Sequence, residues 1–530
     1  MASPARLREG LPAGPGRPTG AERAGVAALV PAAALTAVLA AVAGRPWGLG
    51  ALALAAYAPA CLALLRARRA RHGAVVAATA SLGAASVAYE AAQGLFPGGH
   101  LVVALAACLP HAPAGALAVR LRRSLERRLS PTGASALTLA ALPSLWSAAE
   151  WLPSRPELLG PYALPLAFIG YSQADLPTAQ VARLGSVAAV SHLVLLANCC
   201  LAAAVLAARH AARVRPALRR RALAAATGLL ALGGAGPAGA PVASHHLAAP
   251  PSGSTAGAAG LVVEVVQPNL PDSAYFAASR SPGARAWLLA RIAALASGEA
   301  DLTVLPEAAW PGTVDASSAA EPAAEAGAAW GDLGAVLFGA PAAGFVGAGA
   351  RTNSAFLLAG GELVHVYAKR RPVPIAEDGF AAGPGPGLTS VAGVPLAVFV
   401  CYDALFPSDA RAAVRAGARL LVVITDDAFA AGSDVPELHL TVARLRAVET
   451  GVPVVVAANT GPSAVVLPSG RVAARLPPLA AGALRAVVVP GDGDTPYVAV
   501  GEWLGAANAI LTGGLAAVLR RGGTAHKGPA

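Results

Sequence analysis

Three residues whose side chains can together perform acyl transfer stand where apolar runs of the sequence end. Glu307 lies in VLPEAAW, Lys369 in VYAKRR and Cys401 in FVCYD. A thiol must lose its proton before it attacks a carbonyl carbon, and a carboxylate can accept that proton as general base. A fixed ammonium can then stabilise the charge that develops on the carbonyl oxygen. These residue types together indicate nucleophilic chemistry through Cys401.

Taken one at a time, the same residues have interpretations without chemistry. A strand-end glutamate is usually solvated, a lysine followed by two arginines is usually surface charge, and a cysteine after an apolar strand usually packs in a core. The histidine that we consider as a partner for Cys401, His439, lies in a helical pattern. That position disfavours a Cys–His pair.

The distribution of cysteines favours a chemical role for Cys401. It is the only thiol of a globular region that we expect outside the cytoplasm, so the region offers it no disulfide partner. A lone thiol in an oxidising compartment needs a reason, and catalysis is one. The other four cysteines of the chain fall in predicted membrane spans: Cys61, Cys108, Cys199 and Cys200.

The composition is that of a membrane protein over only part of the chain. Of 530 residues, 55% are hydrophobic and 13% charged, and the apolar segments concentrate before residue 245 and near the C-terminus. A helix needs about 20 mostly apolar residues to cross a bilayer. The predicted spans are 24–43, 48–65, 73–93, 99–120, 133–151, 183–208, 222–241 and 500–519.

The arginines predict the orientation of these spans. Clusters occur at the N-terminus, in the second, fourth and sixth loops and in the C-terminal tail, whereas the intervening loops hold almost none. By the positive-inside rule, both termini are cytoplasmic and the region between spans seven and eight is extracytoplasmic. The segment 222–279, which leads into that region, contains no lysine or arginine. The net charge of +11 therefore reflects topology rather than nucleic-acid binding, which we do not expect.

These patterns predict a sequence of segments. A signal peptide is the alternative for the first span, but no cleavage site stands out and further spans follow. We expect a cytoplasmic tail (1–23), a transmembrane bundle (24–241), a linker (242–260), an extracytoplasmic domain (261–489), a return segment with the last span (490–519) and a second cytoplasmic tail (520–530).

The region 261–489 alternates short β-branched runs, turn residues and helical patterns, which predicts an α/β domain with helix-covered sheets. In one helical pattern, Arg444, Arg446 and Glu449 are expected to form a solvated or paired face. Asp426 and Asp427 have no histidine nearby in sequence, so we expect loop or capping roles and no metal site.

Many segments resemble the nitrilase superfamily, and the whole pattern resembles its membrane-bound apolipoprotein N-acyltransferase family. In the first half the resemblance rests on LWSAAEWLPS and LPLAFIGYSQAD. In the second it rests, in order, on VVQPNLPD, VLPEAAWP, LFGAP, RTNSAF, YAKRRPVPIAEDGF, VCYDALFP, VARLRAVETG and ANTGPSAVVLPSG. The resemblance implies an αββα sandwich on a bundle of about eight spans.

The resemblance also implies roles for individual residues. Glu307 would be the general base, Lys369 the oxyanion-stabilising lysine and Cys401 the nucleophile, with Glu377 supporting the site and no cofactor required. Tyr402 keeps the aromatic residue that follows the family's cysteine. Asp403 departs from the usual glutamate, and TDDAFAAGS departs from N-D-x-W-F-G in a loop expected to line the lipid entrance.

The implied reaction moves an acyl chain from a phospholipid, expected to be phosphatidylethanolamine, through a thioester to the α-amine of a diacylglyceryl-cysteine at a lipoprotein N-terminus. The implied location is the bacterial inner membrane. Trp146, Glu150 and Trp151 lie near a span end, as interfacial anchors or as lining of the substrate chamber. Two alternatives stay open: a membrane-anchored amidase or acyltransferase with another substrate, and an inactive membrane scaffold. The sequence does not indicate an oligomeric state.

Overall fold

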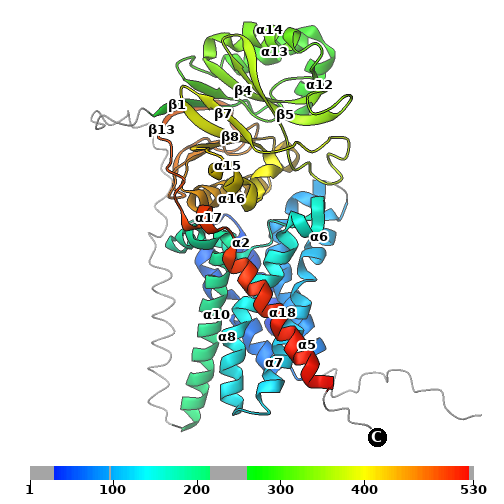
Figure 1. Ribbon diagram of the computed structural model, residues 1–530, viewed down its shortest axis with the longest axis vertical. Coiled ribbons are helices and arrows are strands. Elements are labelled where there is room, and N and C mark those ends of the chain that lie inside the picture. Colours follow the sequence, from blue (N-terminus) through cyan, green and yellow to red (C-terminus); the bar gives the residue numbers. More distant parts are fainter. Residues whose placement is uncertain (1–28, 95–96, 215–259, 525–530) are drawn as a thin grey trace, which may run out of the picture.

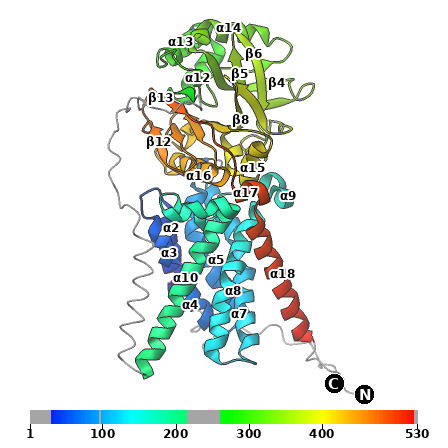
Figure 2. The ribbon, with the colours of Figure 1, turned by 60° about the vertical axis from the view of Figure 1, so that its left-hand side comes forward.

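The computed structural model describes residues 29–94, 97–214 and 260–524, and these form two parts. A bundle of helices carries an α/β domain at one end (Figure 1). The turned view shows the same two parts, with α18 running down the bundle after the α/β domain (Figure 2). The predicted tail 1–23, the predicted seventh span 222–241 and nearly all of the linker 242–260 lie outside the described residues.

Alanine-rich helices make up the bundle and pack closely where glycines leave room. A Cβ at Gly83 would lie 1.7 Å from the backbone oxygen of Ala37, and one at Gly73 would lie 2.4 Å from that of Gly115. Small residues are what allow membrane helices to approach this closely. The main helices are α2 (Val30–Gly44), α3 (Ala53–Ala56), α4 (Ala58–Arg66), α5 (Ala70–Ala88), α6 (Gly99–Cys108), α7 (His111–Leu125), α8 (Pro131–Trp151), α10 (Ala182–Val214) and α18 (Trp503–Thr524).

Three described segments are both long and apolar enough to cross a membrane: Gly99–Leu125, Pro177–His210 and Trp503–Arg521. Val30–Gly44 and Gly50–Arg66 are apolar but shorter. A helical membrane half is therefore confirmed, whereas the number of eight spans stays a prediction.

The α/β domain contains two sheets that pack face to face. The first has the order β13-β1-β2-β4-β5-β6, with β3 beside β4, and the second has the order β12-β11-β10-β9-β8-β7. The strands of the first are β1 (Leu261–Gln267), β2 (Leu302–Val304), β3 (Val314–Asp315), β4 (Ala335–Ala343), β5 (Arg351–Ala359), β6 (Glu362–Ala368) and β13 (Gly482–Val488). Those of the second are β7 (Gly387–Val391), β8 (Val394–Val400), β9 (Leu420–Thr425), β10 (Val454–Ala458), β11 (Ala464–Val466) and β12 (Val472–Arg475).

Side chains alternate along the strands and so fill three apolar layers. In β8, Leu396 and Val398 join the core between the sheets, whereas Ala397 and Phe399 face the helices. Helices cover both outer faces, which makes the αββα arrangement and confirms the predicted fold class (Figure 1). Outside the first sheet lie α12 (Asp272–Arg280), α13 (Pro282–Ala293) and α14 (Ala320–Trp330), and outside the second lie α15 (Pro407–Arg415), α16 (Val435–Thr450) and α17 (Pro496–Val500).

Helix α16 joins the α/β domain to the bundle. Its Glu449 is fully buried and accepts hydrogen bonds from Ser186 Oγ at 2.9 Å and from the Val187 backbone N–H at 2.8 Å. Helix α10 is non-helical at Gly185 and Ser186, so the carboxylate satisfies the Val187 N–H at the start of the helix that restarts there. All three residues of the predicted face are therefore paired. Arg446 and Glu449 pair inside the molecule, whereas Arg444 pairs with the exposed Asp175.

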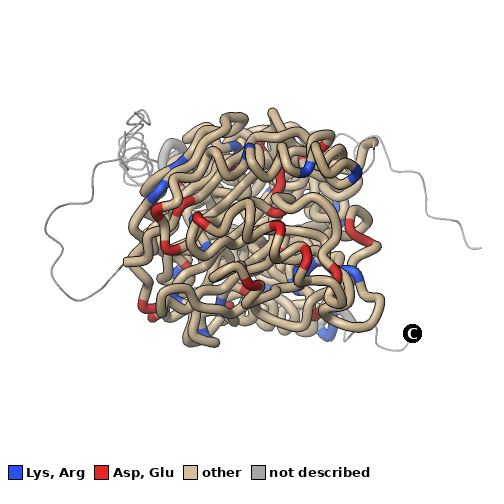
Figure 3. Tube along the Cα trace, turned by 90° about the horizontal axis from the view of Figure 1, so that it is seen from above, with Lys and Arg blue, Asp and Glu red and all other residues tan. Residues whose placement is uncertain are grey.

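Charged positions of both signs are interspersed along the chain when the α/β domain is seen from above (Figure 3).

Candidate active site

The three predicted catalytic residues follow strands that belong to both sheets. Glu307 lies three residues after β2 and Lys369 directly follows β6, both in the first sheet. Cys401 directly follows β8 in the second sheet. Because the two sheets face each other, their strand ends bring the three side chains to one edge of the sandwich.

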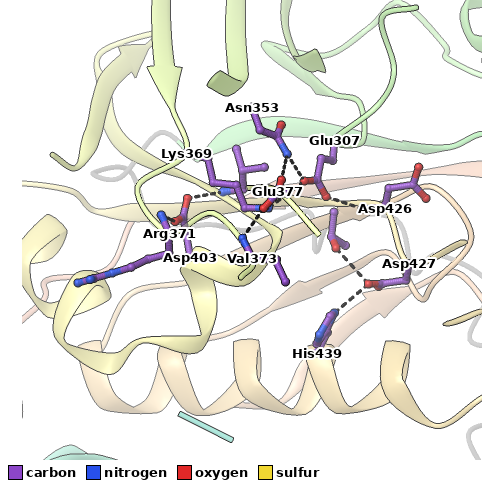
Figure 4. A network of polar contacts seen from close by, with 12 residues as sticks. Glu307, Asn353, Lys369, Arg371, Val373, Glu377, Asp403, Asp426, Asp427 and His439 are labelled. Atoms are coloured by element: carbon purple, nitrogen blue, oxygen red, sulfur yellow. Dashed lines mark hydrogen bonds and ion pairs between the residues drawn. The ribbon is translucent and has the colours of Figure 1, made fainter. Parts of the chain in front are cut away.

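Lys369 stands between two carboxylates in an almost fully buried position (Figure 4). Its Nζ lies 3.2 Å from Glu307 Oε1 and 2.9 Å from Glu377 Oε2. Burial alone would lower the pKa of Lys369, but Glu307 and Glu377, together with Cys401 whenever that thiol is ionised, outweigh the effect of burial and raise the pKa. The side chain therefore stays an ammonium and remains available to stabilise a negative charge.

Two further N–H donors hold Glu307 in place. Asn353 Nδ2 donates to Glu307 Oε1 at 2.7 Å and to Glu377 Oε1 at 2.7 Å, and the Asp426 backbone N–H donates to Glu307 Oε2 at 3.0 Å (Figure 4). Close backbone packing is needed here, since a Cβ at Gly339 would lie 1.9 Å from the Glu307 backbone oxygen. Both oxygens of Glu307 are thus oriented before any substrate binds.

Cys401 has a backbone conformation that non-glycine residues rarely adopt. Its φ is +49°, at the turn from β8 into a short 3-10 helix, Cys401–Leu405, and its side chain is half-buried. Strain of this kind concentrates at functional sites. Burial and the charge of Glu307 raise the pKa of the thiol, and Lys369 opposes them. The resting side chain is therefore a thiol that requires a base before it can attack.

Sequence models of two families match the chain. The model described as carbon-nitrogen hydrolase matches residues 263–492, and the model described as apolipoprotein N-acyltransferase N-terminal domain matches residues 36–200. An apolipoprotein N-acyltransferase from Pseudomonas syringae pv. tomato is 30% identical over 378 residues, which is 67% of this chain and 70% of that protein. The chain belongs to the apolipoprotein N-acyltransferase family.

Other relatives align over shorter stretches. The apolipoprotein N-acyltransferase of Azotobacter vinelandii is 36% identical over 152 residues, 28% of this chain and 29% of that protein. The chain spans about a quarter of the length of this and the next four curated relatives, between 22% and 29% of each. An amidase of the nitrilase superfamily from Nesterenkonia has a solved structure that covers 49% of this chain and 98% of its own, with 25% identity and a TM-score of 0.34.

Asp403, where the sequence departs from the family's usual glutamate, has a partner for each carboxylate oxygen. Oδ1 accepts from the Arg371 backbone N–H at 2.7 Å, and Oδ2 accepts from Tyr367 Oη at 2.8 Å and from the Val400 backbone N–H at 3.1 Å. Burial raises the pKa of Asp403 to about 6, although Lys369 and these donors oppose it. The shorter side chain therefore still ties the nucleophile's turn to the strand that carries Lys369.

Tyr402 links the predicted nucleophile's neighbourhood to the membrane half. Its hydroxyl donates to the Ala163 backbone oxygen at 3.2 Å, and its ring packs edge-on against Phe406. Ala163 belongs to the segment between α8 and α10. The residue next to Cys401 therefore contacts the bundle directly.

The three predicted chamber residues lie in the upper part of the bundle. Trp146 and Glu150 are buried, and Trp146 packs against Tyr57 and His111. Trp151 is half-buried and donates from Nε1 to Glu502 Oε2 at 2.9 Å. These contacts are all with the bundle and the start of α18, so the assignment of the three residues to the substrate chamber stays a prediction.

Several site residues are missing from the sequence-based set. Asn353 is a polar residue in the otherwise apolar strand β5, a signal that could have identified it. Asp427 accepts hydrogen bonds from Thr425 Oγ1 at 3.2 Å and pairs with His439 Nδ1 at 2.8 Å. His439 therefore lies close to the site although it is distant in sequence, and only the packing of α16 on the second sheet reveals this.

Asp426 has the loop role that its sequence context predicts. Its Oδ1 accepts from the Ala428 backbone N–H at 3.1 Å and from Asn459 Nδ2 at 3.2 Å, and burial raises its pKa to about 6. Within residues 29–94, 97–214 and 260–524, no three His, Cys, Asp or Glu side chains are grouped as metal ligands.

Proposed function

We propose that this chain transfers an acyl chain from a phospholipid to the α-amine of a diacylglyceryl-cysteine at the N-terminus of an apolipoprotein. Cys401 is the nucleophile, Glu307 the general base, Lys369 the oxyanion-stabilising group and Glu377 the residue that fixes Lys369. The observation that carries the proposal is the buried ammonium between two oriented carboxylates, beside a strained and half-buried thiol.

The first half-reaction forms a thioester. Glu307 takes the thiol proton of Cys401, and Sγ attacks the ester carbonyl carbon of the phospholipid. The carbonyl oxygen becomes an anion, which the Lys369 ammonium stabilises. When the tetrahedral intermediate collapses, the carbon–oxygen bond of the ester breaks, and the proton on Glu307 passes to the leaving lysophospholipid oxygen.

The second half-reaction returns the enzyme to its starting state. The lipoprotein α-amine attacks the thioester carbonyl, and Glu307 takes the proton that the amine loses. The carbon–sulfur bond breaks, so the products are an amide and a thiolate, and the proton on Glu307 restores the thiol. A thioester survives between the two steps if the site excludes water.

The position of the site supports lipid substrates. Through Tyr402, the turn that carries Cys401 contacts the segment between α8 and α10, so the nucleophile stands next to the membrane half. A site at the bilayer surface avoids moving acyl chains into water. We infer that this surface is extracytoplasmic, that both termini are cytoplasmic and that phosphatidylethanolamine is the donor.

The reaction is tested with the full-length protein in phospholipid vesicles. Phosphatidylethanolamine with a labelled acyl chain should acylate a diacylated lipopeptide, and mass spectrometry should find the labelled chain on Cys401 when the acceptor is omitted. Cys401→Ala should do neither, whereas Cys200→Ala, which changes an exposed cysteine of the bundle, should behave as the unchanged protein. Acyl transfer at the normal rate by Cys401→Ala would refute the assignment of Cys401 as the nucleophile.

The same adduct separates the alternatives. An acyl adduct without transfer to the lipopeptide would indicate an acyltransferase or amidase with another acceptor, and no adduct from any phospholipid would indicate a scaffold.

The orientation in the membrane is tested with a reporter fused after Gly260. A reporter that is active only outside the cytoplasm should be active, and activity of a cytoplasmic reporter would show the opposite topology.

A further inference from the structure

Cys401 and Thr425 occupy equivalent positions at the ends of neighbouring parallel strands. Val400 of β8 pairs with Ile424 of β9, so the next residue of each strand is Cys401 or Thr425. Thr425 is buried, and its hydroxyl favours the Cys401 thiolate and so opposes the rise of the thiol pKa. The register therefore places Thr425 next to Cys401 at neighbouring strand ends of the second sheet.

A buried line of contacts continues from Thr425 away from the sulfur. Thr425 Oγ1 donates to Asp427 Oδ1 at 3.2 Å, and His439 Nδ1 lies 2.8 Å from the same oxygen (Figure 4). Asp427 is 1% exposed, and a Cβ at Gly461 would lie 2.8 Å from its other oxygen. Asp427 is thus confined, with Thr425 on one side and His439 on the other.

A threonine hydroxyl has one hydrogen and cannot donate it to Asp427 and to sulfur at once. While Cys401 is a thiol, its S–H can donate to Thr425 Oγ1, and Thr425 can donate to Asp427. Once Cys401 is a thiolate, sulfur can accept a hydrogen bond, and the Thr425 hydroxyl can rotate to donate one. Asp427 would lose a donor in that rotation but would keep the one from His439.

We propose that Thr425 is a positioning residue whose hydroxyl rotates, so that its hydrogen bond passes from Asp427 to Cys401 Sγ when the thiol loses its proton. His439 permits this rotation because it keeps Asp427 hydrogen-bonded. The proposal rests on the proposed function only in taking Cys401 as nucleophile and Glu307 as the acceptor of its proton. No proton is transferred between Cys401, Thr425 and Asp427, because the Thr425 hydroxyl rotates and keeps its own hydrogen.

Other charged groups act on the same atoms and must be separated from this effect. Cys401 is also influenced by Glu307, Lys369 and Asp427. His439 is influenced by Asp427, Glu307 and Lys369, and Asp427 raises its pKa against the effect of burial. If His439 acted on Cys401 only through its charge, its effect would be independent of the Thr425 hydroxyl and would require a cationic side chain.

The experiment measures alkylation of Cys401 by iodoacetamide as a function of pH. It uses the full-length protein in detergent micelles, and mass spectrometry of the peptide that contains residue 401 excludes signal from the other cysteines. Thr425→Val should slow alkylation at neutral pH about tenfold and move the midpoint of the pH profile upward by about one pH unit, because the thiolate loses a donor. Thr425→Ser, which restores a hydroxyl, should return the profile to within about twofold of the unchanged protein.

Variants of His439 decide between a hydrogen bond and a charge. His439→Leu removes the donor to Asp427 and should slow alkylation, whereas His439→Gln keeps an N–H donor without charge and should slow it much less. Alkylation of the double variant Thr425→Val/His439→Leu should be no slower than that of Thr425→Val, because both changes act on the same hydrogen bond from Thr425 to the thiolate. Thr441→Val is the matched control on α16, since Thr441 only donates to the Glu437 backbone oxygen, and it should leave the profile unchanged.

Two results would overturn the proposal. Multiplicative slowing in the double variant would show that His439 acts independently of Thr425, and equal slowing by His439→Gln and His439→Leu would show that charge is what matters. Alkylation does not require a lipid substrate, so this result is distinct from the proposed function. If acyl transfer were absent but alkylation followed the expected pattern, the proposed substrate would be refuted and the proposed rotation of the Thr425 hydroxyl would be supported.

Discussion

Two buried ion pairs in this protein use the same chemistry for different purposes. Lys369 and Arg446 are each 1% exposed, and each pairs with glutamate carboxylates, Glu307 and Glu377 in one case and Glu449 in the other. Burying such charges costs several kcal/mol, which good geometry and further hydrogen bonds must offset. Neither pair can therefore be explained as a simple addition to stability.

The two pairs differ in what surrounds them. Lys369 lies beside the half-buried thiol of Cys401, so its charge acts on a group that can react. Glu449 instead accepts hydrogen bonds from the Ser186 hydroxyl and the Val187 N–H of α10, and Arg446 Nη2 donates to the Tyr171 hydroxyl at 3.4 Å. The first pair prepares a reaction, and the second holds the α/β domain on the bundle.

The largest expected effect is on catalysis at the first pair. Lys369→Met should lower acyl transfer by about 10²–10³-fold or more, because the oxyanion loses its charged donor. The melting temperature should fall less than in Arg446→Met, since Asn353 and the Asp426 N–H still satisfy Glu307. Labelled-chain transfer and thermal unfolding in detergent measure the two effects. Retention of more than about a tenth of the activity would contradict the role of Lys369.

At the second pair we expect a large effect on stability. Arg446→Met leaves the Glu449 carboxylate buried without its ion partner and should destabilise the protein by about 3–5 kcal/mol. The double variant Arg446→Met/Glu449→Leu should recover part of that loss, although Ser186 and Val187 N–H lose their acceptor. Thermal unfolding measures both, with Arg444→Met as control, because Arg444 pairs with the exposed Asp175. Equal loss in Arg444→Met would show that the buried pair has no special role.

A smaller effect on catalysis is expected at Asn353, which contacts the carboxylates of the first pair but not those of the second. Asn353→Ala removes donors from both Glu307 and Glu377 and should slow thioester formation about tenfold. Thr352→Val is the neighbouring control, because the Thr352 hydroxyl faces Ser354. The rate of adduct formation on Cys401 measures this change. An unchanged rate would show that Asn353 is not needed to orient the two carboxylates.

The smallest expected effect is on the pH dependence of stability. The Asp427 carboxylate raises the pKa of His439 above its ordinary value of 6.5, in spite of burial. A raised histidine pKa contributes stability that is complete below the unfolded-state pKa and is lost as pH rises through the folded-state pKa. The melting temperature of the unchanged protein should therefore exceed that of His439→Gln by more at pH 6 than at pH 9. A difference that grows toward pH 9 would mean that His439 is bound as the neutral imidazole.

Sequence patterns were sufficient for residues whose position in an element carries the signal. Glu307, Lys369 and Cys401 each follow an apolar strand run, and that local pattern is the signal that the sequence carries. Whether the three strand ends meet at one edge depends on the direction of the strands in the two sheets. The α/β class of the domain followed from the same runs, whereas the αββα arrangement was implied by the resemblance to the nitrilase superfamily. Boundaries were harder where elements are short or unusually paired: β13 returns from far along the chain to lie antiparallel to β1.

Residues that act through partners distant in sequence could not be predicted in the same way. Asn353 bridges two carboxylates only because β5 lies between β4 and β6, and Thr425 adjoins Cys401 only because β8 and β9 are parallel neighbours in register. His439 was set aside because it lies in a helical pattern, yet α16 places it on Asp427. Arg446 and Glu449 were expected on a helix face, and the bundle that buries them lies more than 200 residues earlier.

The sequence by itself determined the kinds of groups available: a thiol, an ammonium and carboxylates at strand ends, and apolar helices beside them. These follow from local patterns of burial and turn chemistry. Tertiary structure alone decided which carboxylate holds Lys369, which hydroxyl faces Cys401 and which ion pair anchors the domain. The reason is that hydrogen bonds and ion pairs act over about 3 Å, and only strand register and helix packing determine which distant residues come that close.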